Sequence, residues 1–503
     1  MYDWTNIKNF FEKRYVLLWV NILFLISFSL FFRFLTSNVV ESGGDAIYKW
    51  SIVKQYVLFG EVPFQLNHHA CRWAINIPLF LLQKVFGTAP KFYYIWPFVT
   101  STLSALFAFL LLEKVRTWRL GLVAAILLIF SDPMLRQGTQ LLPMGTVVPF
   151  VLLALYFLIR WRDKKDKFNI VISAFFLFIA YGAKITTVYY IPAFLSLLYL
   201  FSDDKKNFVR NGVCFLSVFV VFFAVETFFF NTLTCSSFGR MELIQDSHRP
   251  IRAINLATNT WQSCSSSLLQ YLANFLVYFK YPGRAPAVLY YSTIIVAVIA
   301  LNKKWNDISI TAVPFLFGFL GHAYAVTSIF PFTRPERVLF RYQSVVFELA
   351  LLTILLFLSA PRFNKSALKC LSSSNRKDQV IRSIFFFALF IPITVNAVKR
   401  IHLDTGYMQT NRTMSLVRGA KEEGNPVYIL QGETERESIK RIIKFRALYT
   451  NERYFGRTPY NRVHNIHLTD FPSIIRDGDS YMLVDSNGYV GDLETKAILL
   501  DRY

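Results

Sequence analysis

The stretch FNIVISAFFLFIAYGAKITTVYYIPAFLSLLYLF, residues 168–201, contains a single charged side chain, Lys184. A helix of about 20 apolar residues crosses the hydrocarbon core of a bilayer. The stretch is therefore long enough for two membrane spans, at 168–183 and 185–201, with Lys184 between them. It predicts an all-α membrane protein that crosses the bilayer more than once.

Apolar runs of similar length recur on both sides of this stretch. They predict about eleven spans, at residues 15–36, 92–112, 120–131, 144–159, 168–183, 185–201, 211–230, 287–301, 308–327, 343–359 and 383–398. No small-residue cleavage site follows Leu35, so the first run is predicted to be an uncleaved span rather than a signal peptide. Of the 503 residues, 54% are hydrophobic, which excludes a single soluble core, a disordered chain and a disulfide-dense secreted module.

Basic residues are distributed unequally between the segments that join these spans. Segments 1–14, 113–119, 160–167, 202–210, 302–306 and 360–382 hold 22 Lys and Arg in 66 positions, against 14 in 138 on the opposite side. Because basic loops stay in the cytoplasm, the N-terminus is predicted to be cytoplasmic and residues 399–503 to lie outside. The net charge of +22 is then mainly a topology signal, and no nucleic-acid partner is expected.

Most of the sequence outside the spans falls on the outer side. Loop 37–91 contains a short apolar piece, 74–86, predicted to be an interfacial helix at the outer leaflet. Loop 231–286 ends in the amphipathic stretch LLQYLANFLVYF. Residues 399–503 contain two strand-like pieces, PVYIL and SYMLVD, and a helix-like piece, ESIKRIIKFRALY. The chain is thus predicted to form a transmembrane domain, 1–398, and a small α/β domain, 399–503.

The five cysteines allow one disulfide on the outer side. Cys235 and Cys264 share loop 231–286, where oxidation can occur, whereas Cys214 lies in a span, Cys370 is cytoplasmic and Cys71 has no evident partner. Two unpaired thiols are the alternative. No Cys or His spacing indicates a zinc site.

Two carboxylates follow the first span closely. Glu41 and Asp45 flank Gly43 and Gly44, which allow a sharp turn near the membrane, and Lys49 follows Asp45 by one helical turn. Asp45 is a candidate catalytic base. The alternative is a helix-capping role without chemistry.

Basic side chains form the second group of candidates. His68, His69 and Arg72 lie further along the first outer loop, and Lys184 separates two apolar spans. Histidine pairs are more often structural than ligands, and a lysine near a membrane surface often snorkels. A buried lysine, however, needs a partner or an anionic ligand.

Arginines at the outer ends of two spans complete the set. Arg136 follows the third span, and TRPERVLFRYQ brings Arg334, Arg337 and Arg341 to the start of the tenth. Such arginines commonly meet lipid phosphates, but several that converge from different loops suit a bound phosphate ligand.

These motifs resemble those of the GT-C glycosyltransferases, integral-membrane enzymes that take sugar from a polyprenyl-phosphate carrier. The resemblance covers most of residues 10–360. Asp45 in SGGDAIYKW, or Glu41, matches the family's acidic residue after the first span, and HHACRWAINIPLFLLQKVFG matches its His-containing segment and interfacial helix, without the family's double proline. Lys184 in AYGAKITTVYYIP and the pair Arg341-Tyr342 also look like family features. Length, loops and outer tail are similar to those of bacterial O-antigen glucosyltransferases of the serotype-conversion type.

The resemblance implies a reaction and a place for it. Asp45 or Glu41 would take the proton of an acceptor hydroxyl while the polyprenyl phosphate leaves as a stable anion. Lys184, Arg337 and Arg341 would hold that phosphate, and His68, His69 and Arg72 would line the sugar or acceptor cleft. Lys49 would help to keep Asp45 ionised, and Arg136 is a further substrate-binding candidate. The expected donor is a polyprenyl-phosphate sugar, and the acceptor is a surface or lipid-linked glycan. A divalent metal could assist, although no ligand set in the sequence requires one.

The implied location is the inner (plasma) membrane of a bacterium, with membrane lipids, a lipid-sugar synthase and a flippase as associated partners. Two other functions remain open. A transporter or flippase for a lipid-linked glycan would also place basic residues in its spans, but no inverted repeat is visible. A glycan polymerase would share the spans and the arginine-rich outer loops.

Overall fold

The structure is a computed structural model of residues 1–503. It describes residues 4–36, 44–60, 68–234, 239–244, 285–324 and 343–360, four short strands between 427 and 491, and a few single positions. All structural statements below refer to these residues.

Helices lie over ten of the eleven predicted spans. They are α1 (Trp4–Thr36), α4 (Ile95–Val115, preceded by the 3-10 turn η1, Pro90–Tyr94), α5 (Trp118–Phe130), α7 (Pro143–Lys164), α8 (Lys167–Ala183), α9 (Tyr190–Phe201, preceded by η2, Ile185–Tyr189), α10 (Lys205–Thr234), α13 (Ala285–Asn302), α14 (Asn306–Tyr324) and α15 (Ser344–Leu358). The eleventh span, 383–398, lies almost entirely outside the described residues.

Four of these helical segments are long and apolar enough to cross a bilayer by themselves: Tyr15–Thr36, Lys91–Val115, Pro143–Lys164 and Lys205–Thr234. The remaining apolar helices are shorter, such as α5, α8 and α15. The chain is thus a helical membrane protein, and the number eleven stays a prediction.

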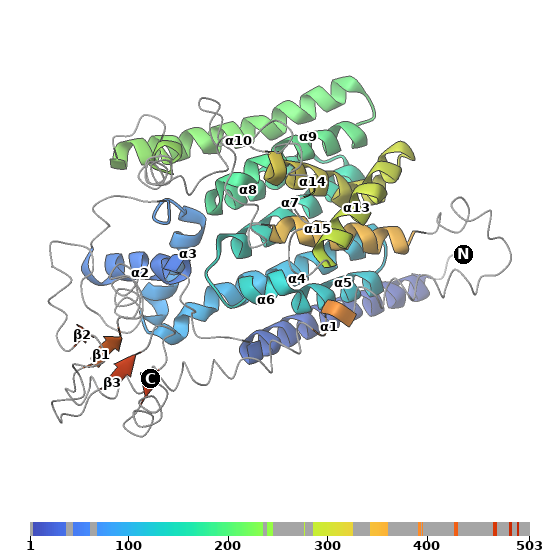
Figure 1. Ribbon diagram of the computed structural model, residues 1–503. Helices are drawn as coiled ribbons and strands as arrows, with labels where there is room; N and C mark the ends of the chain where they lie inside the picture. Colours follow the sequence, from blue (N-terminus) through green and yellow to red (C-terminus); the bar gives the residue numbers. More distant parts are fainter. Residues whose placement is uncertain are drawn as a thin grey trace.

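The helices pack into one bundle around α4 and α7 (Figure 1). α4 contacts α1, α5 and α7, while α8 lies between α7 and α10, and α14 contacts α9, α13 and α15. α1 and α10 lie on opposite sides of the bundle and expose long apolar side chains, among them Val16, Leu23, Phe34, Val220, Phe228 and Leu233. These two helices therefore present the apolar surface that lipid would cover.

Local sequence explains where several helices begin and how closely they pack. Thr117 Oγ1 accepts a hydrogen bond from Leu120 N at the start of α5, and Asp166 Oδ1 accepts one from Phe168 N at the start of α8. A Cβ on Gly121 would lie 2.5 Å from the carbonyl oxygen of Phe109, so the close approach of α5 to α4 requires glycine there.

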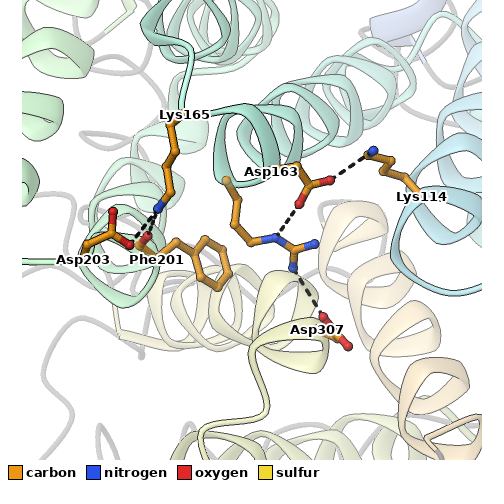
Figure 2. A network of polar contacts seen from close by, with 7 residues as sticks. Lys114, Asp163, Lys165, Phe201, Asp203 and Asp307 are labelled. Atoms are coloured by element: carbon orange, nitrogen blue, oxygen red, sulfur yellow. Dashed lines mark hydrogen bonds and ion pairs between the residues drawn. The ribbon is translucent and has the colours of Figure 1, made fainter.

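The ends of α4, α7 and α14 that belong to the predicted cytoplasmic side are joined by ion pairs (Figure 2). Asp163 lies 3.1 Å from Lys114 Nζ and 3.0 Å from Arg162 Nε. Asp307 at the start of α14 forms ion pairs with Arg162 and Arg116, and in each pair Nη1 of the arginine lies 3.3 Å from a carboxylate oxygen of Asp307. We call this end of the bundle the cytoplasmic end and the opposite end the outer end, following the predicted orientation.

A second contact pins the next loop at the same end. Lys165 Nζ lies 3.0 Å from Asp203 Oδ1 and donates to the carbonyl oxygen of Phe201 at 3.0 Å, which joins the end of α7 to the end of α9 (Figure 2). The cytoplasmic end is therefore held together across four helices by side chains as well as by short loops.

Four strands form a sheet in the C-terminal part of the chain: β1 (Val427–Leu430), β2 (Ile466–Thr469), β3 (Met482–Val484) and β4 (Val490–Gly491), in the order β2-β1-β3-β4. β1 pairs in parallel with β2 and β3, with Val427 opposite Ile466 and Met482, and β4 is antiparallel to β3. The strands predicted from PVYIL and SYMLVD are thus present. The predicted helix 437–449, which an α/β domain needs, lies outside the described residues.

Candidate active site

The first outer loop folds into two helices that pack against each other, α2 (Gly44–Phe59) and α3 (Trp73–Phe86), at the outer end of the bundle (Figure 1). α3 is the helix predicted at 74–86. Gln83 Nε2 donates to the carbonyl oxygen of Trp50 at 3.1 Å, and the Trp50 ring packs edge-on against Tyr93. Tyr93 Oη in turn accepts a hydrogen bond from Leu141 N at 2.9 Å. This chain of contacts fixes the loop on the starts of α4 and α7.

The structure places Asp45 as the second residue of α2. The side chain of Asp45 and the whole of Glu41 lie outside the described residues. The first turn of a helix favours an ionised carboxylate, because the helix dipole is positive there. This position suits both a catalytic base and a helix-capping residue, so the two interpretations of Asp45 stay open.

α2 also carries two buried lysines. Lys49, one turn after Asp45, is fully buried, and so is Lys54, which sequence reasoning missed. Burial lowers the pKa of Lys54 to about 8, because the charged form loses solvation. Positive charge is thus built into the face of α2 that packs inward.

The segment His68 to Arg72 forms a tight turn that leads into α3. Asn76 Nδ2 donates to the carbonyl oxygens of His69 and Ala70, at 3.0 and 2.8 Å, and the two histidine rings lie 3.8 Å apart. His69 is buried, and Arg72 occupies the N-cap position of α3. The turn is therefore a rigid part of the outer end.

Cys71 lies within the same turn and is fully buried. Burial raises the pKa of its thiol to about 11, so the thiolate is scarce at neutral pH. A nucleophilic role for Cys71 is not supported.

Lys184 lies at the outer end, between α8 and η2, with extended backbone at φ −155° and ψ 126°. Its N–H donates to the carbonyl oxygen of Ala180 at 3.1 Å, and Thr187 closes the turn by bonding to Lys184 O and Ala180 O. The lysine side chain is half-buried, and its charge acts on His322 near the end of α14. Lys184 therefore stands where the outer ends of α8, α9 and α14 meet.

A buried polar cluster beside Lys184 was not anticipated from the sequence. Glu226 of α10 lies 2.7 Å from Arg240 Nε and accepts a hydrogen bond from Trp73 Nε1 at 2.6 Å. Arg240 also donates to the carbonyl oxygens of Gly182 and Tyr181, at 2.9 and 3.0 Å. Glu226 could have been found from the sequence, because it is the single charged residue in the apolar run FFAVETFFF. A charged side chain inside a membrane span is energetically costly and is therefore a candidate for function.

A second pair of charged residues inside predicted spans was also missed. Arg33 of α1 and Glu348 of α15 are both fully buried and act on each other electrostatically. Arg33 Nε donates to Ser101 Oγ at 3.2 Å, but the other guanidinium nitrogens and both Glu348 oxygens have no hydrogen-bond partner within the described part of the chain. Both lay in predicted spans, where any charge is a candidate for function.

The structure does not show Arg136, Arg337 and Arg341 close together, because only Arg136 is among the described residues. Arg136 is exposed, and its guanidinium lies 3.5 Å from Asp132 on the same short helix, α6 (Asp132–Gln137). Its neighbour Gln137 is buried and donates to Ser344 Oγ at 3.1 Å, which links α6 to the start of α15. Arg337 and Arg341, like Cys235 and Cys264, lie outside the described residues.

No group of three or more His, Cys, Asp or Glu side chains that could hold a metal ion occurs among the described residues. The side chains best suited to a divalent cation at the outer end, those of Glu41 and Asp45, are not among them.

Neither a family model nor a curated protein matches the chain. Solved structures do resemble it. The oligosaccharyltransferase of Archaeoglobus fulgidus, in complex with Zn and sulfate, superposes with a TM-score of 0.52 at 12% identity, over 86% of this chain and 62% of that chain. This chain shares the fold of that oligosaccharyltransferase.

Two further structures show weaker likeness. ArnT from Cupriavidus metallidurans in the apo state gives a TM-score of 0.47 at 12% identity, over 96% of this chain and 94% of that chain. The oligosaccharyltransferase AglB from Archaeoglobus fulgidus, with an inhibitory peptide and a dolichol-phosphate, gives 0.49 at 12%, over 87% and 60%. The chain described here spans about three fifths of the length of the oligosaccharyltransferases that it resembles.

Proposed function

We propose that this GT-C chain is a membrane glycosyltransferase. It transfers a hexosyl group, with glucose as the first candidate, from a polyprenyl-phosphate donor to a cell-surface glycan such as O-antigen. The reaction takes place at the outer end, which on this proposal faces away from the cytoplasm of a bacterium, with the N-terminus cytoplasmic and the α/β domain 399–503 outside.

The proposed reaction is a single displacement that inverts the anomeric carbon. An acceptor hydroxyl attacks this carbon while Asp45, with Glu41 orienting the acceptor, takes the hydroxyl proton. The bond from the anomeric carbon to the phosphate oxygen breaks, and its electron pair leaves with the polyprenyl phosphate. Because this phosphate is a stable anion, the step needs basic side chains that hold negative charge rather than a general acid.

One observation carries the proposal: the loop that contains Asp45 is anchored to the segment that contains Lys184. Trp73 at the start of α3 contacts the last turn of α8 through Glu226 and Arg240, and Lys184 follows that turn directly. A carboxylate loop and a lysine far apart in sequence thus belong to one rigid region at the membrane surface. Lys184, Lys49, Arg337 and Arg341 are proposed to bind phosphate, with Arg136 at the rim, and His68, His69 and Arg72 to line the sugar or acceptor cleft.

A divalent cation, if the reaction uses one, would be held by carboxylates such as Glu41 and Asp45. It would supply additional positive charge for the leaving phosphate. The steps above use only side chains of this chain. The proposed partners are the lipid-linked donor, the glycan acceptor and membrane lipids, supplied by a lipid-sugar synthase and a flippase.

The direct test uses the purified full chain, a polyprenyl-phosphate hexose and a lipid-linked acceptor glycan. We expect a product larger by one hexose in mass spectrometry and an inverted anomeric configuration in its NMR spectrum. Comparison of the surface glycan of cells with and without the gene identifies the natural sugar and linkage. Transfer of whole repeat units instead of single sugars would favour a polymerase.

The transporter alternative makes a different demand on the ion pairs at the cytoplasmic end. A transporter that alternates its access must separate its helices at that end, whereas Asp163 and Asp307 tie α4, α7 and α14 together there (Figure 2). Movement of the lipid-linked sugar across proteoliposome membranes without any transfer product would support a flippase and contradict the proposed function.

A further inference from the structure

The structure contains a buried charge pair that the proposed reaction does not use. Glu226 and Arg240 are both nearly fully buried, with 2.7 Å between Oε1 and Nε, and Trp73 Nε1 bonds to the same oxygen. Elsewhere α10 exposes long apolar side chains such as Val221, Phe228 and Phe229. Since a buried ion pair often stabilises a protein no more than apolar residues of the same volume, its partners are the better guide to its role.

Arg240 completes the C-terminal end of α8. The last carbonyl groups of a helix lack donors within the helix. Arg240 supplies two, through Nη1 to Gly182 O and Nη2 to Tyr181 O, and its guanidinium lies 4.3 Å from the centre of the Tyr181 ring. The helix ends one residue later at Ala183, and the next residue is Lys184. Arg240 therefore holds the last turn of α8, directly before Lys184, in addition to the hydrogen bonds that Lys184 and Thr187 make with Ala180 O.

Trp73 joins the first outer loop to the same turn. A Cβ on Gly182 would lie 2.3 Å from Cζ2 of Trp73, so the indole ring rests directly against the backbone of α8. Trp73 is the first residue of α3 and follows Arg72. Glu226 bridges Trp73 and Arg240, and thus connects α3, α8 and α10 at one point.

We infer that Trp73, Glu226 and Arg240 form a clamp that positions Lys184 to bind the phosphate of a polyprenyl phosphate and the His68 to Arg72 turn to line the adjoining sugar or acceptor cleft. This inference rests on the proposed function and adds three positioning residues to it. The clamp does not touch the reacting atoms. It acts by fixing the position of the segment that contains Lys184 relative to the turn from His68 to Arg72.

A double-mutant cycle on polyprenyl phosphate binding tests the inference. The purified full chain in detergent is titrated with polyprenyl phosphate itself, in the wild type, Arg240→Gln, Lys184→Met and the double variant. Arg240→Gln is expected to weaken binding on the order of tenfold, and to add almost nothing once Lys184 is replaced, because coupled residues are not additive. Arg240→Lys should recover only part of the affinity, since lysine has no fork of donors for two carbonyl groups.

Cys71 provides a readout that does not depend on donor binding. It is fully buried next to the clamp, where the charges of Arg240, Arg72 and Glu226 act on it. In a chain whose other four cysteines are replaced by alanine, maleimide should label Cys71 slowly at pH 7.5 in otherwise native protein. Arg240→Gln should accelerate this labelling by about tenfold as local opening exposes the thiol.

A matched control lies at the opposite end of the bundle. Asp307→Asn weakens two ion pairs, with Arg116 and Arg162, and should change neither polyprenyl phosphate binding nor Cys71 labelling. The inference is overturned if Arg240→Gln leaves binding unchanged, or if its effect adds fully to that of Lys184→Met, even when labelling rises. A wild type that binds no polyprenyl phosphate contradicts the proposed function and removes the phosphate role of the clamp, while Cys71 labelling still reports whether the clamp holds α3 to α8.

Discussion

At the scale of single residues, the chemistry of the proposed reaction depends on one carboxylate. Asp45 is the second residue of α2, and the buried Lys49 follows one turn later. On the proposed mechanism this carboxylate takes the proton of the acceptor hydroxyl, whereas basic side chains bind the donor phosphate. Its value as a base should therefore be separable from donor binding.

Asp45→Asn keeps the shape of the side chain and removes its basicity. We expect turnover of a polyprenyl-phosphate sugar to fall by about 10² to 10⁴, with little change in donor affinity. Glu41→Gln should lower turnover by a smaller factor. Both are measured as single turnovers with purified protein. Reversed effects would exchange the roles of the two carboxylates, and a loss below tenfold in both variants would contradict the mechanism.

Lys184 is the second residue whose role can be isolated. A charged side chain beside apolar spans is costly unless it is compensated or reaches the membrane surface, and Lys184 lies at the outer end between α8 and η2. Lys184→Met is therefore expected to insert and fold at least as well as the wild type, yet to bind polyprenyl phosphate poorly. Titration with the lipid, alongside a thermal unfolding curve, measures both. Unchanged affinity would favour a snorkelling lysine.

At the scale of helices, buried charged side chains lie at the contacts between helices. Arg33 of α1 donates a hydrogen bond to Ser101 of α4. It also interacts electrostatically with Glu348 of α15. A Cβ on Gly138 would lie 2.5 Å from Arg33 Nε, so α6 packs tightly over the same side chain. Four helices thus meet around one buried arginine.

Removal of either charge should leave the other buried without compensation. Arg33→Met is expected to lower the free energy of unfolding by about 3 to 5 kcal/mol, and the double variant Arg33→Met/Glu348→Gln to recover most of that loss. Unfolding in detergent measures both. Lys165→Met serves as the control, because its pair with the exposed Asp203 is worth about 1 kcal/mol or less. Equal stability of the single and double variants would mean that the two charges are not coupled.

At the scale of the whole molecule, the basic side of the chain coincides with the end of the bundle that ion pairs hold closed. Arg116, Arg162 and Lys165 all belong to segments predicted to be cytoplasmic, and all three make ion pairs at that end. Figure 2 shows the pair between Lys165 and Asp203. The first outer loop, as α2 and α3, lies at the other end (Figure 1). The segments predicted to share the cytoplasmic side thus lie at one end of the bundle, while the side of the membrane that this end faces stays a prediction.

This orientation has a direct test. A reporter that is active only outside the cytoplasm should work when fused after Tyr503, and should fail when fused within 362–382. The physical reason is that positively charged segments are retained in the cytoplasm during insertion. Equal expression of both fusions, checked by immunoblot, is the control. An inactive reporter after Tyr503 would change the number of spans and move residues 399–503 to the cytoplasm.

The sequence was sufficient for features that depend on neighbours along the chain. Apolar runs about as long as the membrane is thick predicted the places of ten described helices, and strand-like pieces at 426–430 and 480–485 predicted β1 and β3. Glu41, Asp45, Lys184 and the basic loops were visible because a charge beside an apolar run stands out in the sequence itself.

Only the tertiary structure decided which distant side chains meet. Trp73, Glu226 and Arg240 are separated by up to 167 positions, yet they share one contact point because α3, α8 and α10 pack there. Nothing in the sequence near Glu226 identifies Arg240 as its counter-charge, and the same holds for Arg33 and Glu348. Spans are set by the free energy of transferring local apolar surface into lipid, whereas the partner of a buried charge depends on how whole helices pack.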